Sequence, residues 1–313
     1  MLLKRWISVF AVLVLPQFLQ AAQWKATVGA DSNDQGMQAL AFLPNEMWIH
    51  EGDSIVWTFV TNEIHTVTFL TDGHPRLPFP VGCPGFTPSP ATFTGANCVT
   101  TPPLVKPDSY TVIFTTAGNY KLVCLVHENM TAAIHVLLLS APLPHNQDFY
   151  DKQAATEQSE LLSDKLHDHG KTEKNAVTAG NGQVVATGGG SETVSHMRFM
   201  DDKVLIRAGE TVEWTNEDPV TPHTITFGTE PADPMPPVGT FVDPDGARHA
   251  IVTSPSDNVH SGFIVAGPQE RLFLPQMPLP VTRFRVTFPN AGVYPYKCAL
   301  HDDLGMKGTV TVK

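Results

Sequence analysis

The sequence predicts an all-β protein built from two tandem β-sandwich domains. Its 313 residues include 27 prolines and 23 glycines, a content typical of turn-rich, strand-rich folds. Residues 39–69 align with residues 196–227, so the chain contains an internal repeat. A chain of this length can form two domains, each with its own core. We place the domains at residues 24–140 and 193–313.

Short strands separated by tight turns recur in both halves of the chain. Residues 49–57 and 206–214 each read as a strand, a Gly-containing turn and a second strand of alternating residues. Such short alternating strands favour an antiparallel sandwich. The matching positions are Phe42 with Phe199, Gly52 with Gly209, Trp57 with Trp214 and, after one inserted residue, His65 with His223.

Residues 1–22 have the pattern of a secretory signal peptide. Lys4 and Arg5 precede a short apolar run at 6–15, and small residues follow at Ala21-Ala22. The apolar run is too short to span a bilayer. The sequence therefore predicts an exported protein, periplasmic or secreted, whose mature chain is not inserted in a membrane.

The segment 141–192 differs in composition from the two domains and is predicted to be a linker. Residues 146–169 have apolar side chains at helical spacing without Gly or Pro, which predicts an amphipathic helix ending at Gly170. Residues 178–191 are rich in Gly, Ser and Thr and are expected to form a flexible connection.

The charge balance limits the class of partner. The formal net charge is −11, and removal of Lys4 and Arg5 with the signal peptide changes it to −13. An acidic chain argues against nucleic acid and against anionic membrane surfaces as partners. It is compatible with electrostatic steering towards a basic protein.

Two of the four cysteines lie close together in a Pro/Gly-rich segment. Cys83 and Cys98 are separated by 15 residues, and an exported protein folds in an oxidising compartment. We expect them to form a disulfide. A second metal site at these cysteines is disfavoured because histidines at ligand spacing are missing nearby.

The other two cysteines each belong to a loop that occurs twice. Both loops follow the pattern Phe-x-x-Ala-Gly-x-Tyr-x-x-x-Cys, at residues 114–124 and 288–298, and both continue with a His and a Met. Two imidazoles, one thiolate and one distant thioether are the ligands of a type 1 (blue) copper centre. The predicted copper ligands are His65, Cys124, His127 and Met130 in the first domain and His223, Cys298, His301 and Met306 in the second.

These loops resemble those of the cupredoxins. The loop at 298–306 is similar to that of plastocyanin, and the loop at 124–130 is similar to the shorter one of amicyanin. The resemblance covers both domains but not the linker. It implies Greek-key sandwiches of eight strands with copper near one end. It also implies that His127 and His301 lie near apolar surfaces where redox partners, such as a cytochrome or a copper oxidoreductase, dock.

The first domain departs from the family pattern at one position. Plastocyanin-like proteins carry an Asn in a Trp-x-Asn strand that helps to brace the copper loop, and Trp214 and Asn216 match this pattern. Phe59 occupies the corresponding position in the first domain. Because residues around the ligands tune a metal site, the two sites are expected to differ in potential or stability.

The sequence thus predicts an exported electron carrier with two type 1 copper ions, and not an enzyme. One alternative is a two-domain copper oxidoreductase of the nitrite reductase or oxidase type, in which histidines usually flank the type 1 cysteine. The neighbours here are Val123, Leu125, Lys297 and Ala299. A second alternative is copper storage or delivery without redox work, which usually uses Met-rich or multi-Cys clusters.

Overall fold

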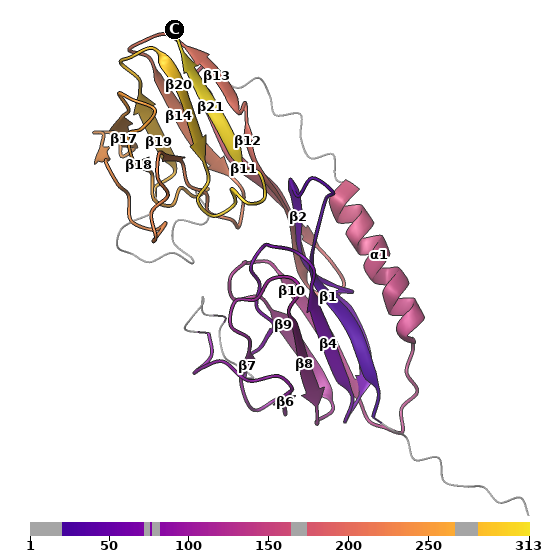
Figure 1. The fold of residues 1–313 in the computed structure, drawn as a ribbon. Coiled ribbons are helices and arrows are strands. Elements are labelled where there is room, and N and C mark those ends of the chain that lie inside the picture. Colours follow the sequence, from indigo (N-terminus) through magenta and orange to yellow (C-terminus); the bar gives the residue numbers. More distant parts are fainter. Residues whose placement is uncertain (1–20, 72–75, 77–81, 164–173, 267–280) are drawn as a thin grey trace, which may run out of the picture.

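The computed structural model describes residues 21–71, 76, 82–163, 174–266 and 281–313. Two β-sandwiches lie end to end, and one helix runs beside the first of them (Figure 1). The predicted all-β class and the two tandem sandwiches are confirmed. Most of the predicted signal peptide and Gly170 lie outside the described residues.

The first sandwich contains ten strands in two layers. One layer has the order β2-β1-β4-β8-β6, and the other has the order β3-β10-β9-β5-β7. The strands are β1 (Gln23–Asp31), β2 (Met37–Leu43), β3 (Glu46–His50), β4 (Ser54–Phe59), β5 (Thr68–Phe69), β6 (Ala91–Phe93), β7 (Val99–Thr100), β8 (Ser109–Phe114), β9 (Gly118–Val123) and β10 (Thr131–Leu137).

The second sandwich repeats this plan with one additional strand. Its layers are β16-β17-β19-β14-β11-β12 and β13-β21-β20-β15-β18. The strands are β11 (Ala176–Ala186), β12 (Ser191–Met200), β13 (Lys203–Ile206), β14 (Thr211–Glu217), β15 (Thr226–Phe227), β16 (Phe241–Val242), β17 (Arg248–Ile251), β18 (Val259–His260), β19 (Arg283–Thr287), β20 (Gly292–Lys297) and β21 (Lys307–Val312).

The strand pairing is mixed, whereas the sequence predicted an antiparallel sandwich. β1 and β4 form a parallel pair, and β3 and β10 form another. The second sandwich has the same parallel pairs, β11 with β14 and β13 with β21. In each sandwich the strand pairs that lead into the cysteine loop, β9 with β10 and β20 with β21, are antiparallel.

The two sandwiches share one continuous sheet of 11 strands, because β2 pairs with β12 in antiparallel register. Gln38 lies opposite Ser195 in this pairing. Phe42 and Phe199 are equivalent in the repeat, and they lie four residues after Gln38 and Ser195, respectively. Gln38 and Ser195 are therefore also equivalent, so Gln38 faces its own counterpart. The pairing therefore relates the two sandwiches by an approximate two-fold axis near Gln38 and Ser195, in the manner of an isologous interface.

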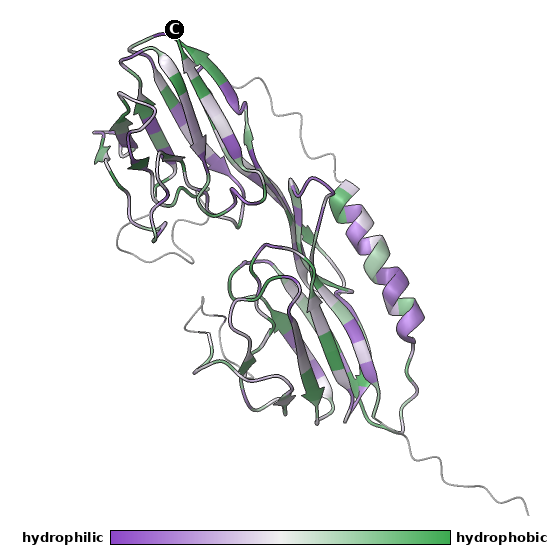
Figure 2. Cartoon of the chain, viewed as in Figure 1, coloured by the Kyte–Doolittle hydropathy of each residue, from purple (hydrophilic) through white to green (hydrophobic). Residues whose placement is uncertain are grey.

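Each sandwich has its own apolar core. Trp57 and Trp214, the equivalent tryptophans of β4 and β14, are 1 % and 0 % exposed. Trp57 packs against Phe69 and Phe114, and Trp214 packs against Phe227. Hydrophobic and hydrophilic residues alternate along many strands, as the period of two requires (Figure 2).

The predicted helix is present as α1, Gln147–Ser163. It lies along β1 and β2 of the first sandwich (Figure 1). The Tyr150 hydroxyl accepts a hydrogen bond from Trp48 N at 2.8 Å and donates one to Trp48 O at 3.0 Å. At the other end of the helix, Leu161 packs into a cluster with Ala41 and Leu43. The helix is therefore part of the first sandwich and not a free spacer.

The prediction of a flexible linker at residues 178–191 is wrong. Residues 176–186 form β11, which pairs with β14 and β12 inside the second sandwich. The glycines that suggested flexibility include Gly180, which has a φ of 71° at an irregularity in the β11–β12 register. Its conformation is a β-bulge, where glycine is favoured for its positive φ.

The predicted disulfide between Cys83 and Cys98 is present, with the two Cα atoms 5.9 Å apart. Cys124 and Cys298 are free thiols and are buried. Among the described residues, no helix is long and apolar enough to cross a membrane.

One buried carboxylate between α1 and the shared sheet gives a pH prediction. Burial, with Glu157 and Glu160 nearby, raises the pKa of Glu192 to about 8. The folded state then holds a proton that the unfolded state releases between about pH 4.5 and 8, so this group makes the protein less stable as the pH rises through that window.

Replacing Glu192 by Gln should remove this fall in stability with rising pH. We expect Glu192→Gln to increase the free energy of unfolding by about 1 kcal/mol or more at pH 9, with a smaller effect at pH 5. Urea denaturation of both proteins at the two pH values measures this difference. A gain that is larger at pH 5 would contradict the assignment.

Candidate metal centres

The first site is formed by three residues from two segments of the chain. His65 lies between β4 and β5 and is fixed by two backbone hydrogen bonds with Leu104, of 3.0 and 2.9 Å. Cys124 follows β9, and His127 lies three residues further on. The Nδ1 atoms of His65 and His127 are 3.2 Å apart, and Cys124 Sγ lies 3.9 Å from His127 Nδ1.

The second site has the same construction. His223 is paired with Ile264 by backbone hydrogen bonds of 3.0 and 2.8 Å. The Nδ1 atoms of His223 and His301 are 3.1 Å apart, and Cys298 Sγ lies 3.9 and 3.4 Å from them. In each site the three donor atoms lie within 4.8 Å of one another. The two sets of three residues that the sequence predicted to be ligands are therefore brought together.

Each predicted methionine closes its cysteine loop. Cys124 N donates to Met130 O at 3.0 Å, and Cys298 N donates to Met306 O at 3.1 Å. Both methionines are fully buried in the cores that contain the cysteines. The loop geometry therefore places the Met backbone beside the cysteine, and axial ligation by the thioethers stays a prediction.

The surroundings of both cysteines favour the ionised thiolate, which is the form that binds a metal cation. Burial raises the pKa of Cys124, but its contacts with His127 and His65 lower that pKa well below its ordinary value. Burial likewise opposes ionisation of Cys298, and His301 and His223 lower its pKa well below the ordinary value. A thiolate with two imidazoles at these separations suits copper, which accepts soft sulfur and nitrogen ligands together.

Backbone and hydroxyl groups fix the thiolate in both sites. At the first site, Thr66 N and His127 N donate to Cys124 Sγ at 3.5 and 3.4 Å. At the second, Thr224 N donates to Cys298 Sγ at 3.4 Å. The hydroxyl of each threonine also accepts a bond from the residue after the cysteine, at 2.8 and 2.7 Å. The sulfur position is thereby set by the threonine that directly follows the upstream histidine.

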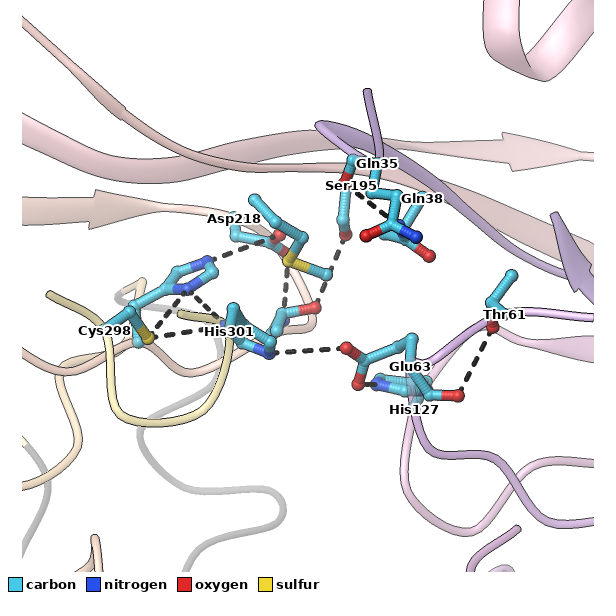
Figure 3. Close-up of polar contacts among 12 residues, drawn as sticks. Gln35, Gln38, Thr61, Glu63, His127, Ser195, Asp218, Cys298 and His301 are labelled. Atoms are coloured by element: carbon cyan, nitrogen blue, oxygen red, sulfur yellow. Dashed lines mark hydrogen bonds and ion pairs between the residues drawn. The ribbon is translucent and has the colours of Figure 1, made fainter. Parts of the chain in front are cut away.

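The loop histidines turn their other ring nitrogen towards one shared carboxylate. His127 Nε2 lies 3.1 Å from Glu63 Oε1, and His301 Nε2 lies 3.4 Å from Glu63 Oε2 (Figure 3). His127, His301 and Glu63 are 2 %, 3 % and 6 % exposed. Burial alone raises the pKa of Glu63, but His301 and His127 lower it to about 2. The carboxylate is therefore held ionised between the two sites.

This arrangement corrects an expectation drawn from the family resemblance. His127 and His301 were expected near apolar surfaces open to redox partners. Instead, the two sites face each other, and each loop histidine is buried against the other sandwich through Glu63. No sequence pattern indicated Glu63, because its contacts come from both halves of the chain.

The upstream histidines have different groups behind them. Thr61 Oγ1 lies 3.5 Å from His65 Nε2, whereas Asp218 Oδ2 lies 3.7 Å from His223 Nε2. Asp218 is fully buried, and its other oxygen accepts bonds from the backbone N–H groups of Val220 and Thr221. Burial lowers the pKa of His223, but Asp218 and the Cys298 thiolate raise it to about 9. The upstream histidine of the first site thus has the neutral hydroxyl of Thr61 beside it, and that of the second site has the carboxylate of Asp218.

Asn216 braces the segment that carries the upstream histidine. Its Nδ2 donates to Thr221 O at 2.9 Å and to Ile264 O at 3.0 Å, and its Oδ1 accepts from Asp218 N at 2.7 Å. These contacts hold the turn that leads to His223, whereas the resemblance implied support of the copper loop. Phe59, its counterpart, is buried in the apolar core.

Two glycines that the sequence reading did not single out lie against the upstream histidines. Gly29 and Gly180, in the bulges of β1 and β11, have φ values of 73° and 71°. A β-carbon at Gly180 would overlap the ring of His223, and one at Gly29 would lie 3.0 Å from His65 Nε2. The similar segments Thr-Val-Gly-Ala-Asp and Val-Thr-Ala-Gly-Asn contain the signal that could have identified them.

We expect Gly180→Ala to lower the free energy of unfolding by about 1–3 kcal/mol more than Gly209→Ala does, because only the first crowds a buried ring. Gly209 is a matched control, since its φ is 86° and a β-carbon there would meet nothing within 4 Å. Chemical denaturation of the metal-free proteins measures both. Equal losses would show that backbone strain alone explains the glycine.

Comparison with known proteins relates this chain to copper-binding proteins. The family model of copper binding proteins, plastocyanin/azurin family, matches residues 183–313. Plastocyanin from Scenedesmus fuscus is 30 % identical over 115 residues, which are 37 % of this chain and 86 % of that protein.

Similar solved structures include a mutant plastocyanin of fern and the amicyanin of Paracoccus versutus. The first is 23 % identical with a TM-score of 0.23, over 44 % of this chain and 99 % of that one. The second is 16 % identical with a TM-score of 0.26, over 37 % of this chain and 81 % of that one.

Proposed function

Because the chain belongs to the plastocyanin/azurin family of copper-binding proteins, we propose that it is an exported electron-transfer protein with two type 1 copper ions. The observation that carries this proposal is the duplicated cluster of one thiolate and two imidazoles, with nearly equal separations of donor atoms in the two sandwiches. In this role the chain makes no substrate bond, and its redox partners are other proteins.

The ligands would be the residues predicted from the sequence. Bound copper would supply one-electron chemistry between its cuprous and cupric states. The chain's own residues hold the donors at fixed positions, since each upstream histidine is locked into a β-bridge and each thiolate is held by its threonine. Complete burial of both thiolates excludes water from the sulfur. Little rearrangement is then required when the charge changes.

Counting the coppers tests the proposal directly. The mature chain loaded with Cu(II) should bind two equivalents and show intense blue absorption that is lost on reduction. Cys124→Ser and Cys298→Ser should each remove one blue centre and leave the other. Metal analysis and visible spectroscopy measure this. Fewer than one reducible blue centre per chain would overturn the function, and a type 2 copper signal would favour a catalytic oxidoreductase.

The groups behind the upstream histidines predict an order of potentials. A carboxylate behind a ligand histidine makes the ligand more basic and stabilises the more highly charged ion, so Asp218 should lower the potential of the second site. At the first site, Arg76 Nε instead donates to Cys124 O at 2.9 Å and places a positive charge there. The second site should therefore be the better electron donor.

We expect Asp218→Asn to raise the potential of the second site by roughly 60 mV or more while the first site stays within experimental error. Asn keeps an oxygen for the Val220 and Thr221 N–H groups, so the turn should survive. Spectroelectrochemical titration in the Cys124→Ser and Cys298→Ser backgrounds assigns each potential. A lower potential at the second site in this variant would contradict the order.

A further inference from the structure

Glu63 lies between the two metal centres and contacts both of them. Its segment joins β4 to β5, two residues before the ligand His65. One carboxylate oxygen meets His127 of its own sandwich, and the other meets His301 of the second sandwich (Figure 3). All three side chains are at least nine-tenths buried. One charged group therefore connects two ligand histidines across the boundary between the sandwiches.

The connection is held by rigid contacts. Besides the pairing of β2 with β12, Arg198 on β12 donates to Leu304 O in the second cysteine loop at 2.7 Å and to Asp34 O in the first sandwich at 2.5 Å. Ser195 and Thr221 hydroxyls are 3.4 Å apart beside this pairing. Since a sheet hydrogen-bond ladder and the half-buried guanidinium of Arg198 fix the sandwiches together, the distance between the sites is fixed as well.

We propose that Glu63 is the contact through which the two copper sites exchange electrons within one chain. This inference rests on the proposed function. The path runs from the His301 ring through the Glu63 carboxylate to the His127 ring, and it crosses only two non-bonded gaps, of 3.4 and 3.1 Å. With copper bound at both sites, one electron would pass from Cu(I) at the second site to Cu(II) at the first, so that the second site would be oxidised and the first reduced. No proton or bond is transferred.

The same contact changes how external partners can reach the protein. Both loop histidines are almost fully buried where they meet Glu63, so neither imidazole is open to a second protein. In the proposed path, the two loop histidines pass electrons only between the two sites. Electrons exchanged with partner proteins then enter and leave by other faces of the two sandwiches. Glu63 is therefore a positioning residue for both ligand histidines as well as the link between them.

Glu63→Gln tests this assignment with nearly unchanged volume. Gln can accept from only one imidazole N–H and presents a donor to the other. The intramolecular electron-transfer rate, measured after flash reduction of the Cu(II) protein, should fall by about tenfold or more. The control Glu217→Gln, an exposed carboxylate at the end of β14, should leave the rate unchanged. Metal content and blue absorption should stay at two coppers in both variants.

A second measurement needs neither electron transfer nor a Glu63 variant. In the Cys298→Ser protein, Cu(I) bound at the first site should shift the His301 Nε2–H proton resonance, because Glu63 transmits the change at His127. An unshifted resonance would overturn the link, as would an unchanged transfer rate in Glu63→Gln with both blue centres intact. A wild-type chain without two blue centres would instead overturn the proposed function, so the two failures are distinguishable.

Discussion

The pairing of β2 with β12 is the constraint on which the rest of the molecule depends. Two sandwiches on a flexible tether would sample many orientations, and their sites would be independent. Here the backbone hydrogen bonds of one sheet run through both sandwiches. Because equivalent residues Gln38 and Ser195 face each other, the pairing relates the repeats by a two-fold axis and turns equivalent ends of the sandwiches towards each other. The facing sites are a consequence of that register.

The ligands could be predicted from the sequence because their spacing is local. Cys124 and His127 are three residues apart in a loop whose lead-in recurs before Cys298, and the upstream histidines repeat in register. The helix could be predicted for a similar reason, since its apolar spacing lies within one segment. These features depend on short-range geometry, which a sequence pattern records directly.

The features that sequence reading missed depend on contacts between distant parts of the chain. Gly180 was attributed to a flexible linker because composition does not distinguish a glycine chosen for mobility from one required by a bulge against a histidine ring. Asp218 and Thr61 acquire their significance only where the fold places them behind His223 and His65. The expectation that His127 and His301 lie near surfaces where partners dock failed because both are buried where the two sandwiches meet at Glu63.

The two-fold axis explains why the bridging carboxylate occurs once. Counting back from the upstream histidines, the counterpart of Glu63 is Thr221, which is also buried near the axis. One carboxylate with two oxygens can serve two symmetry-related imidazoles. A second carboxylate at the same place would add a like charge in a dry interface, with no further N–H group from the loop histidines to offset its desolvation. The repeat is therefore symmetric in its metal ligands and necessarily asymmetric at the point where the two sites meet.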